Sequence, residues 1–235
     1  MVTQAGAITK IRERLDETGT PTTWTDAQLR GWINEAVRDI ARLSETIQST
    51  QTVTITSTDI TNGVQEWLLD STTLRVYRVE YQANGQTSVY PLEYGDFNNL
   101  DAVWWTRKTV SSGTPQMFTL WGYPPQLKIV LYPKPSLPGV LRVYYYKVPE
   151  DLVTTTTSDA STTLSVPNGW EDLVYEYVTY LALRRDRDPR WQESKAAYDE
   201  RLTAMLDLTA RWSDQSGAVT PTGSFMPEWL IGGYG

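Results

Sequence analysis

A proline-rich segment between two β-rich runs constrains the fold of this chain more than any other sequence feature. The runs, residues 127–132 and 140–147, are rich in β-branched and aromatic side chains, which favour strands. The segment between them contains Pro133, Pro135 and Pro138, which lack the backbone N–H groups that a strand ladder needs. We therefore predict two strands that run antiparallel to each other and are joined by a turn.

Further strand signals precede this pair of runs. Residues 72–81 and 116–121 have the composition of strands, and Asn84-Gly85 is a typical two-residue hairpin turn before another short strand. Residues 96–105 interrupt these runs with a predicted helical turn or two. The middle of the chain is therefore predicted to be a β-rich unit.

The strongest helix signal lies at residues 25–48. Thr25 is a predicted N-cap, and Gln28 completes a capping box with it. The apolar residues of this segment recur at helical spacing on one face: Leu29, Trp32, Ile33, Ala36, Val37, Ile40, Leu43 and Ile47. A shorter helix is predicted before it, around Ile11.

Two more helices are predicted toward the C-terminus. The first follows Pro167 and carries one apolar stripe: Trp170, Leu173, Val174, Tyr177, Val178 and Leu181. The second begins with Asp188 as N-cap and Pro189 at the first helical position, which is the favoured order. Its apolar residues are Trp191, Tyr198, Leu202, Met205, Leu206 and Trp212.

These signals together predict an α+β fold. Helices from both ends of the chain, residues 1–49 and 167–212, are expected to form an antiparallel helical bundle. Residues 50–166 are expected to form an antiparallel β-module inserted between them, and residues 213–235 an extended C-terminal arm. A chain of 235 residues is long enough to bury a substantial core.

Composition removes several classes of function. The chain has no His and no Cys, so it lacks the usual general base, the commonest metal ligands and a thiol nucleophile. Its net charge of −7 argues against a surface that grips nucleic acid. No segment approaches the roughly 20 apolar residues that span a bilayer, and no secretory signal is visible. We expect no enzymatic activity, no cofactor, no metal and no membrane contact.

The C-terminal segment is unusually apolar for a terminus rich in glycine and proline. Its large apolar side chains are Phe225, Met226, Trp229, Leu230 and Ile231. Such side chains favour a groove over solvent. Two interpretations are open: the segment folds back onto its own domain, or it docks as an arm on a neighbouring subunit.

Several stretches in succession resemble head-to-tail adaptor proteins of tailed bacteriophages. They are residues 24–36, 113–119, 127–135 and 141–146, followed by Val166-Pro167 and a helical pair that ends near Tyr198. The resemblance covers most of the chain. It implies a structural protein of the virion, made in the bacterial cytoplasm, that forms a homo-oligomeric ring beneath the portal protein and bridges to a tail or nozzle protein.

The resemblance also implies details of that ring. It usually copies the portal's twelvefold order, DNA passes through its channel without specific binding, and a C-terminal extension commonly contacts the portal. A tail-completion protein at another level of the tail would obey the same physical constraints and remains an alternative.

Two further groups of residues are candidates for sites that contact partner proteins. Arg184, Arg185 and Arg187 lie at the end of a predicted helix, either as a solvated helix end that complements the helix dipole or as inter-subunit salt bridges. Exposed tips are predicted at Asn84-Gly85 and in the proline-rich turn, at Pro135 and Pro138. These tips can contact the tail-side partner.

Two rival functions use other residues. A sugar-binding module would stack sugar rings on exposed aromatic side chains: Trp104, Trp105, Trp121, Tyr144, Tyr145 and Tyr146. At least one of the three tyrosines is expected to point into the core, because neighbours on a strand face opposite sides. A glycosidase would need two carboxyl groups, drawn from Glu171 and Asp172 or from Glu66, Asp70 and Glu80. Glu171 and Asp172 also have an ordinary explanation, because acidic side chains in the first turn of a helix interact favourably with the helix dipole.

Overall fold

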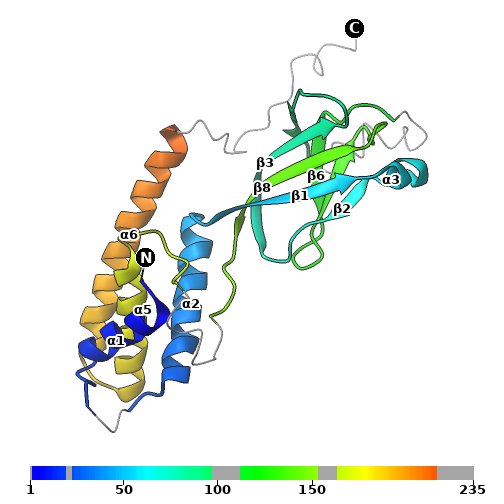
Figure 1. Cartoon of the computed structure of the whole chain (residues 1–235). Coiled ribbons are helices and arrows are strands. Elements are labelled where there is room, and N and C mark those ends of the chain that lie inside the picture. Colours follow the sequence, from blue (N-terminus) through cyan, green and yellow to red (C-terminus); the bar gives the residue numbers. More distant parts are fainter. Residues whose placement is uncertain (1, 20–22, 97–111, 153–162, 216–235) are drawn as a thin grey trace.

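The protein has a mixed α+β fold with two distinct regions. The computed structural model describes residues 2–19, 23–96, 112–152 and 163–215. Within these ranges it contains five helices and two four-stranded sheets. Helices α1, α2, α5 and α6 lie together at one end of an elongated molecule, and both sheets lie at the other (Figure 1). We call these parts the helical region and the β-region.

The helical region begins as the sequence predicts. Helix α1 spans Gln4–Arg14 and α2 spans Asp26–Ser44. The predicted capping box of α2 is present: the Thr25 hydroxyl accepts the Gln28 N–H at 3.3 Å, and the Gln28 side chain accepts the Thr25 N–H at 3.0 Å. Two main-chain donors at the helix start are thereby satisfied.

The predicted C-terminal bound of this helix, residue 48, is wrong. The helix ends at Ser44, and Glu45 takes a left-handed conformation with φ of 48°. Leu43 is 55% exposed, so the apolar stripe does not continue to the end of the segment. Strand pairing begins at Gln48, where the main chain joins a sheet instead of another helical turn.

Helix α5 occupies the centre of the helical region. It spans Glu171–Asp186 and packs against α1, α2 and α6. Its buried residues therefore lie on several sides and not on the single predicted stripe: Leu173, Val174, Tyr175, Val178, Thr179, Tyr180, Ala182 and Leu183. The stripe prediction was incomplete, because a helix surrounded by three others buries most of its circumference.

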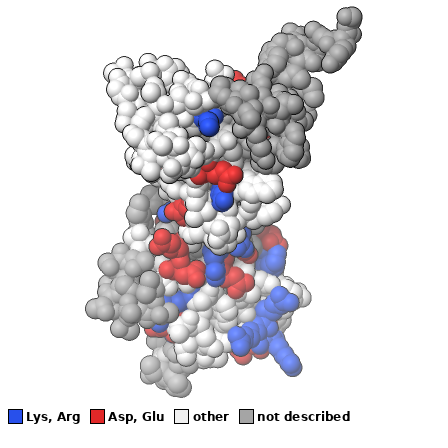
Figure 2. Space-filling model, turned by 90° about the vertical axis from the view of Figure 1, so that its right-hand side faces the viewer, with Lys and Arg blue, Asp and Glu red and all other residues white. Residues whose placement is uncertain are grey.

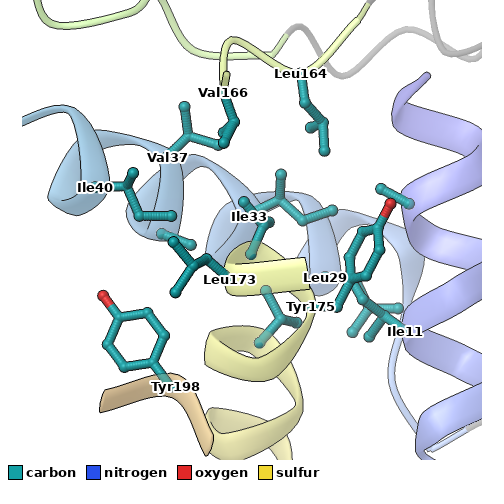
Figure 3. Packing of buried hydrophobic residues seen from close by; sticks show 14 of the residues in the cluster. Ile11, Leu29, Ile33, Val37, Ile40, Leu164, Val166, Leu173, Tyr175 and Tyr198 are labelled. Atoms are coloured by element: carbon teal, nitrogen blue, oxygen red, sulfur yellow. The ribbon is translucent and has the colours of Figure 1, made fainter. Parts of the chain in front are cut away.

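Helix α6 spans Trp191–Gln215, so it begins two residues after Pro189, the predicted first helical position, and includes the first three residues of the predicted arm, 213–215. Before it, the Asp188 carbonyl accepts the Trp191 N–H at 3.1 Å, and the Asp188 carboxylate accepts the Arg190 N–H at 2.9 Å. Figure 3 shows how α1, α2, α5 and α6 point apolar side chains such as Ile11, Leu29, Leu173 and Tyr198 into one cluster.

The β-region consists of two sheets around a second apolar cluster. The first sheet has the order β1, β8, β3, β4, with β1 at Gln48–Ile55, β8 at Gly139–Lys147, β3 at Thr73–Ala83 and β4 at Tyr90–Pro91. The second has the order β2, β7, β6, β5, with β2 at Glu66–Leu68, β7 at Lys128–Tyr132, β6 at Met117–Trp121 and β5 at Glu93–Tyr94. Neighbouring strands are antiparallel except β5 and β6. A short helix, α3 at Ser57–Asn62, follows β1.

The predicted pairing of the two β-rich runs is wrong. Strand β7 lies in the second sheet, whereas β8 lies in the first, between β1 and β3. The prolines do interrupt the ladder, but the segment crosses from one sheet to the other instead of folding back. Strand β8 forms eight residue pairs with β1 and nine with β3, and this long ladder on both sides outweighs a hairpin with the five-residue β7.

The two-residue hairpin predicted at Asn84-Gly85 is also wrong. A turn is present, with φ of 78° at Gly85 and a hydrogen bond of 3.1 Å from the Gln86 N–H to the Ala83 carbonyl. The partner strand, however, begins only at Tyr90, so the connection is longer than two residues. Most of the helical turn predicted at 96–105 lies outside the described residues.

Candidate interaction surfaces

Aromatic rings and arginines that form no ion pair with the described residues meet at the end of the helical region away from the β-region. The rings of Trp24 and Trp32 pack edge to face at 5.1 Å, and the Arg185 guanidinium lies 5.9 Å from the centre of the Trp24 ring. Arg184 donates a hydrogen bond of 2.8 Å to the Tyr180 hydroxyl. We call Trp24, Trp32, Arg184 and Arg185 the arginine–tryptophan surface.

This surface is hollowed and positively charged. A hollow of about 270 Å³ is lined by Trp32, Leu181, Arg184 and Arg185. Among the described residues, neither Arg184 nor Arg185 forms an ion pair, and the same holds for Arg187 in the left-handed turn after α5. Figure 2 shows basic side chains gathered on the helical region at the end remote from the β-region, and acidic ones nearer the junction.

Most other bundle arginines already have carboxylate partners. Arg190 pairs with Asp188 at 2.8 Å and with Asp16 at 3.1 Å. The hydrogen bonds from Arg190 lower the pKa of the Asp188 carboxyl and raise the pKa of the Arg190 guanidinium. The sequence identified Arg184, Arg185 and Arg187 by their position alone, and it is the tertiary structure that places Arg184 and Arg185 beside two tryptophans, without an ion pair to any described residue.

The two predicted tips of the β-region form one surface. The Asn84 N–H donates to the Pro138 carbonyl at 2.9 Å, and the Tyr81 hydroxyl donates to the Leu137 carbonyl at 2.7 Å. Asn84, Gly85 and Leu137 are exposed, and Leu137 has 48% of its surface accessible. We call Asn84, Gly85, Leu137 and Pro138 the joint tip.

One predicted tip residue is misplaced. Pro135 is buried, and it pairs with Gly113 in an isolated bridge. The crossing between the sheets draws this proline inward, and Pro138 is half-buried. Since Ala83 at the end of β3 and Ile55 at the end of β1 both pair with Gly139, the joint tip lies at the end of the sheet away from the helical region.

Of the aromatic residues of the sugar-binding hypothesis that the structure describes, only Tyr144 and Tyr146 lie on the same exposed face. Tyr145 is buried, as predicted from strand alternation, while Tyr144 and Tyr146 lie on the outer face with Tyr77. A hydrogen bond of 2.9 Å to Glu80 raises the pKa of the Tyr144 hydroxyl. Trp121 is 53% exposed but belongs to the other sheet. Trp104 and Trp105 lie outside the described residues.

The nominated carboxylates are separate and locally engaged. Asp172 pairs with Arg14 at 3.0 Å and with Arg201 at 2.7 Å, and its neighbour Glu171 accepts the Gly169 N–H at 2.8 Å. The others have these partners: Glu66 with Lys128, Asp70 with Thr72, and Glu80 with Arg78 and Tyr144. Hydrogen bonds from Thr72 lower the pKa of the Asp70 carboxyl. Such pairs hold elements together, and no cluster of three potential metal ligands occurs in the described ranges.

Phe225, Met226, Trp229, Leu230 and Ile231 lie outside the described residues. None of the described helices is long and apolar enough to cross a membrane. Sequence reasoning missed the open edge of β1, although the alternating threonines of that strand, Thr50, Thr52 and Thr54, were a visible signal for it.

The fold presents two candidate interaction surfaces, the arginine–tryptophan surface in the helical region and the joint tip in the β-region. The family model described as SU10 adaptor protein matches residues 2–222 of the chain. The chain therefore belongs to the SU10 adaptor protein family, which confirms the resemblance to bacteriophage head-to-tail adaptors. It is a phage adaptor, a structural protein of the virion that associates with head and tail components. No curated protein matches the chain.

Proposed function

We propose that copies of this protein form a ring beneath the portal, bridge it to a tail or nozzle protein, and line the channel through which DNA leaves the head. The observation that carries the proposal is the family match over residues 2–222 on an elongated molecule with a candidate binding surface at each end. In this proposal residues 1–49 and 167–212 act as a helical domain, and residues 50–166 act as an inserted β-domain.

The two ends are suited to different partners. The arginine–tryptophan surface combines residue types that dominate binding energy at protein interfaces, and its guanidinium groups, which have no carboxylate partner in the described ranges, favour an acidic partner surface. The joint tip presents uncharged groups, including the exposed Leu137. We assign the helical end to the portal or to a neighbouring subunit, and the joint tip to the tail side.

The C-terminal segment supplies a third contact in this proposal. Its apolar side chains, Phe225, Met226, Trp229, Leu230 and Ile231, act as anchors that dock on the portal or on a neighbouring copy. An arm that docks only when its partner is present lets the free subunit remain soluble until assembly.

DNA passes the ring without being gripped. The net charge of −7 disfavours the phosphate contacts that would hold DNA with strong salt dependence. We propose that a neutral or acidic lumen lets the duplex slide. Twelve copies, matching the portal, is the ring order that we expect.

Electron microscopy of the protein mixed with the portal ring of the same genome tests the proposal. Added density beneath the portal, with the portal's rotational order, is the expected result. An undecorated portal in the presence of folded, monodisperse protein would contradict the ring and favour a role at another level of the tail.

A further inference from the structure

Strand β1 is the only long, unprotected edge among the described strands. The other sheet edges are short and carry a proline or a charge: β4 has two residues and Pro91, β5 has two and Glu93, and β2 has three and Glu66. Strand β1 has eight residues with neither a charged side chain nor a proline. Proteins normally blunt exposed edges with such residues, so an edge without them is suited to pairing with another strand.

The outward-facing main-chain groups of β1 belong to its even-numbered residues, which are Gln48 and three threonines. Lys147 donates to the Ile47 carbonyl at 2.9 Å, which makes this a hydrogen-bonded pair of the antiparallel ladder. Such pairs alternate along the strands, so odd-numbered residues of β1 turn their N–H and C=O groups toward β8. Thr50, Thr52 and Thr54 turn theirs to the open edge, and their side chains are exposed.

The opposite edge of the same sheet presents a short, uncharged segment. The Leu92 N–H donates to the Val79 carbonyl at 2.9 Å, so Val89 and Pro91 turn their main-chain groups away from β3. Residues 87–91 are exposed and carry no charge, and 39% of Val89 and 41% of Tyr90 is accessible. Val89 offers one donor and one acceptor, and Pro91 offers an acceptor.

We propose that the edge of β1 receives residues 87–91 of the next copy in the ring, so that the first sheets of neighbouring copies join. This inference rests on the proposed ring and names the surfaces that close it. A ring contact must join two different surfaces of one molecule, and the two edges of this sheet are such surfaces.

Strand direction is compatible with a ring. The four strands β1, β8, β3 and β4 alternate in direction. When a copy is rotated about an axis parallel to the strands, its β4 therefore arrives antiparallel to β1 of its neighbour. Pairing of β1 with β1 of a second copy would instead follow a two-fold axis and stop at a dimer.

Engineered cysteines test the contact sharply, because the chain has no Cys of its own. Thr52→Cys and Val89→Cys are placed together in the full-length protein, which is assembled on the portal and oxidised. The two edges of one sheet lie three strand spacings apart, roughly 14 Å, which is too far for a disulfide within one copy. A ladder of covalent oligomers on a non-reducing gel is the expected result.

Matched variants separate the possible outcomes. Thr52→Cys with Ser88→Cys should give no ladder, because neighbours on an added strand point to opposite faces. Pairing Val89→Cys with Thr50→Cys or Thr54→Cys covers the two adjacent registers. Dimers from Thr52→Cys alone would overturn the proposal in favour of two-fold pairing. Rings visible by microscopy with no ladder in any register would overturn it while leaving the ring intact, and absence of rings would defeat the proposed function as well.

Discussion

Asn34 in α2 binds both main-chain groups of Leu152, which lies 118 residues away in the chain that returns from the β-region. The Leu152 N–H donates to the Asn34 side-chain oxygen at 2.9 Å, and the Asn34 amide nitrogen donates to the Leu152 carbonyl at 3.5 Å. Arg38, one turn further along α2, pairs with Asp151 at 3.5 Å. One helix face thereby holds the exit of the β-region, as the Arg75–Glu45 ion pair holds its entry.

Replacing Asn34 should loosen the β-region without unfolding it. Asn34→Ala removes both hydrogen bonds and should lower the free energy of unfolding by about 1–2 kcal/mol. Small-angle scattering should then show a broader distribution of molecular dimensions. Asn34→Asp is a matched variant: it keeps the acceptor for the Leu152 N–H but repels the Leu152 carbonyl, so an intermediate effect is expected. Unchanged scattering for Asn34→Ala would contradict this role.

Gly139 at the start of β8 should not tolerate a side chain. A Cβ atom there would lie 2.5 Å from the Gln82 carbonyl oxygen and 2.9 Å from the Tyr81 ring. We expect Gly139→Ala to lower the free energy of unfolding by about 1–3 kcal/mol in denaturant titrations. Gly31→Ala is the control, because Gly31 is exposed in α2 with nothing near its Cβ position. It should stabilise the protein by roughly 0.5–1 kcal/mol.

Alkaline solution should destabilise the helical region. Burial raises the pKa of Tyr198 to about 12, and burial with a hydrogen bond to Glu35 raises the pKa of Tyr177 as well. Both groups titrate near 10 when unfolded, so the fold favours their neutral forms. Their contribution to stability is complete below pH 10 and is lost as pH rises through the folded values.

Thermal melts followed by circular dichroism across pH 8–12 should detect this loss. Tyr198→Phe should flatten the fall of the melting temperature above pH 10, because one titrating group is gone. Tyr123→Phe is the control, since Tyr123 is 86% exposed. Equal slopes for the wild type and Tyr198→Phe would show that Tyr198 is not the responsible group.

Charge reversal on the arginine–tryptophan surface should block assembly and spare the fold. Arg184 and Arg185 are exposed and have no ion pair in the described part of the chain, so Arg184→Glu with Arg185→Glu should leave the melting temperature almost unchanged. Ring formation on the portal should fail, because the acidic partner surface would now be repelled. Arg211→Glu is the control, because it reverses a charge at an exposed position near the C-terminal end of α6, away from this surface. Rings should form normally with this variant. Normal rings with the double variant would remove this surface from the interface.

A charge at the joint tip should block tail attachment without affecting portal binding. Leu137→Asp places a carboxylate on a residue that is 48% exposed, so folding should be unaffected. Portal binding should survive and tail attachment should fail, which electron micrographs of the particles would show. Intact tails on particles carrying Leu137→Asp would refute the assignment of the joint tip to the tail side.

The start of α2 was predictable because its signals are local, whereas α6 begins at Trp191, two residues after the predicted first helical position at Pro189. The Thr25–Gln28 capping box satisfies donors three residues away, and the Asp188-Pro189 turn before α6 likewise uses only its immediate neighbours. The helix end near Ser44 was less predictable, since it depends on the sheet that β1 joins. Arg184 and Arg185 at the end of α5 were identified as candidates from sequence, but their neighbours Trp24 and Trp32 come from another part of the chain.

The sequence by itself determined the long helices and the longer strands, since capping, periodicity and proline act over a few residues, but it did not reveal the short α3 and β2. The absence of His and Cys also excludes any chemistry of this chain that depends on an imidazole or a thiol side chain. Only the tertiary structure decided that β8 pairs with β1 and β3 instead of β7, and that Pro135 is buried. Main-chain hydrogen bonds between strands are the same for every partner, so the choice depends on how both sheets enclose their shared core.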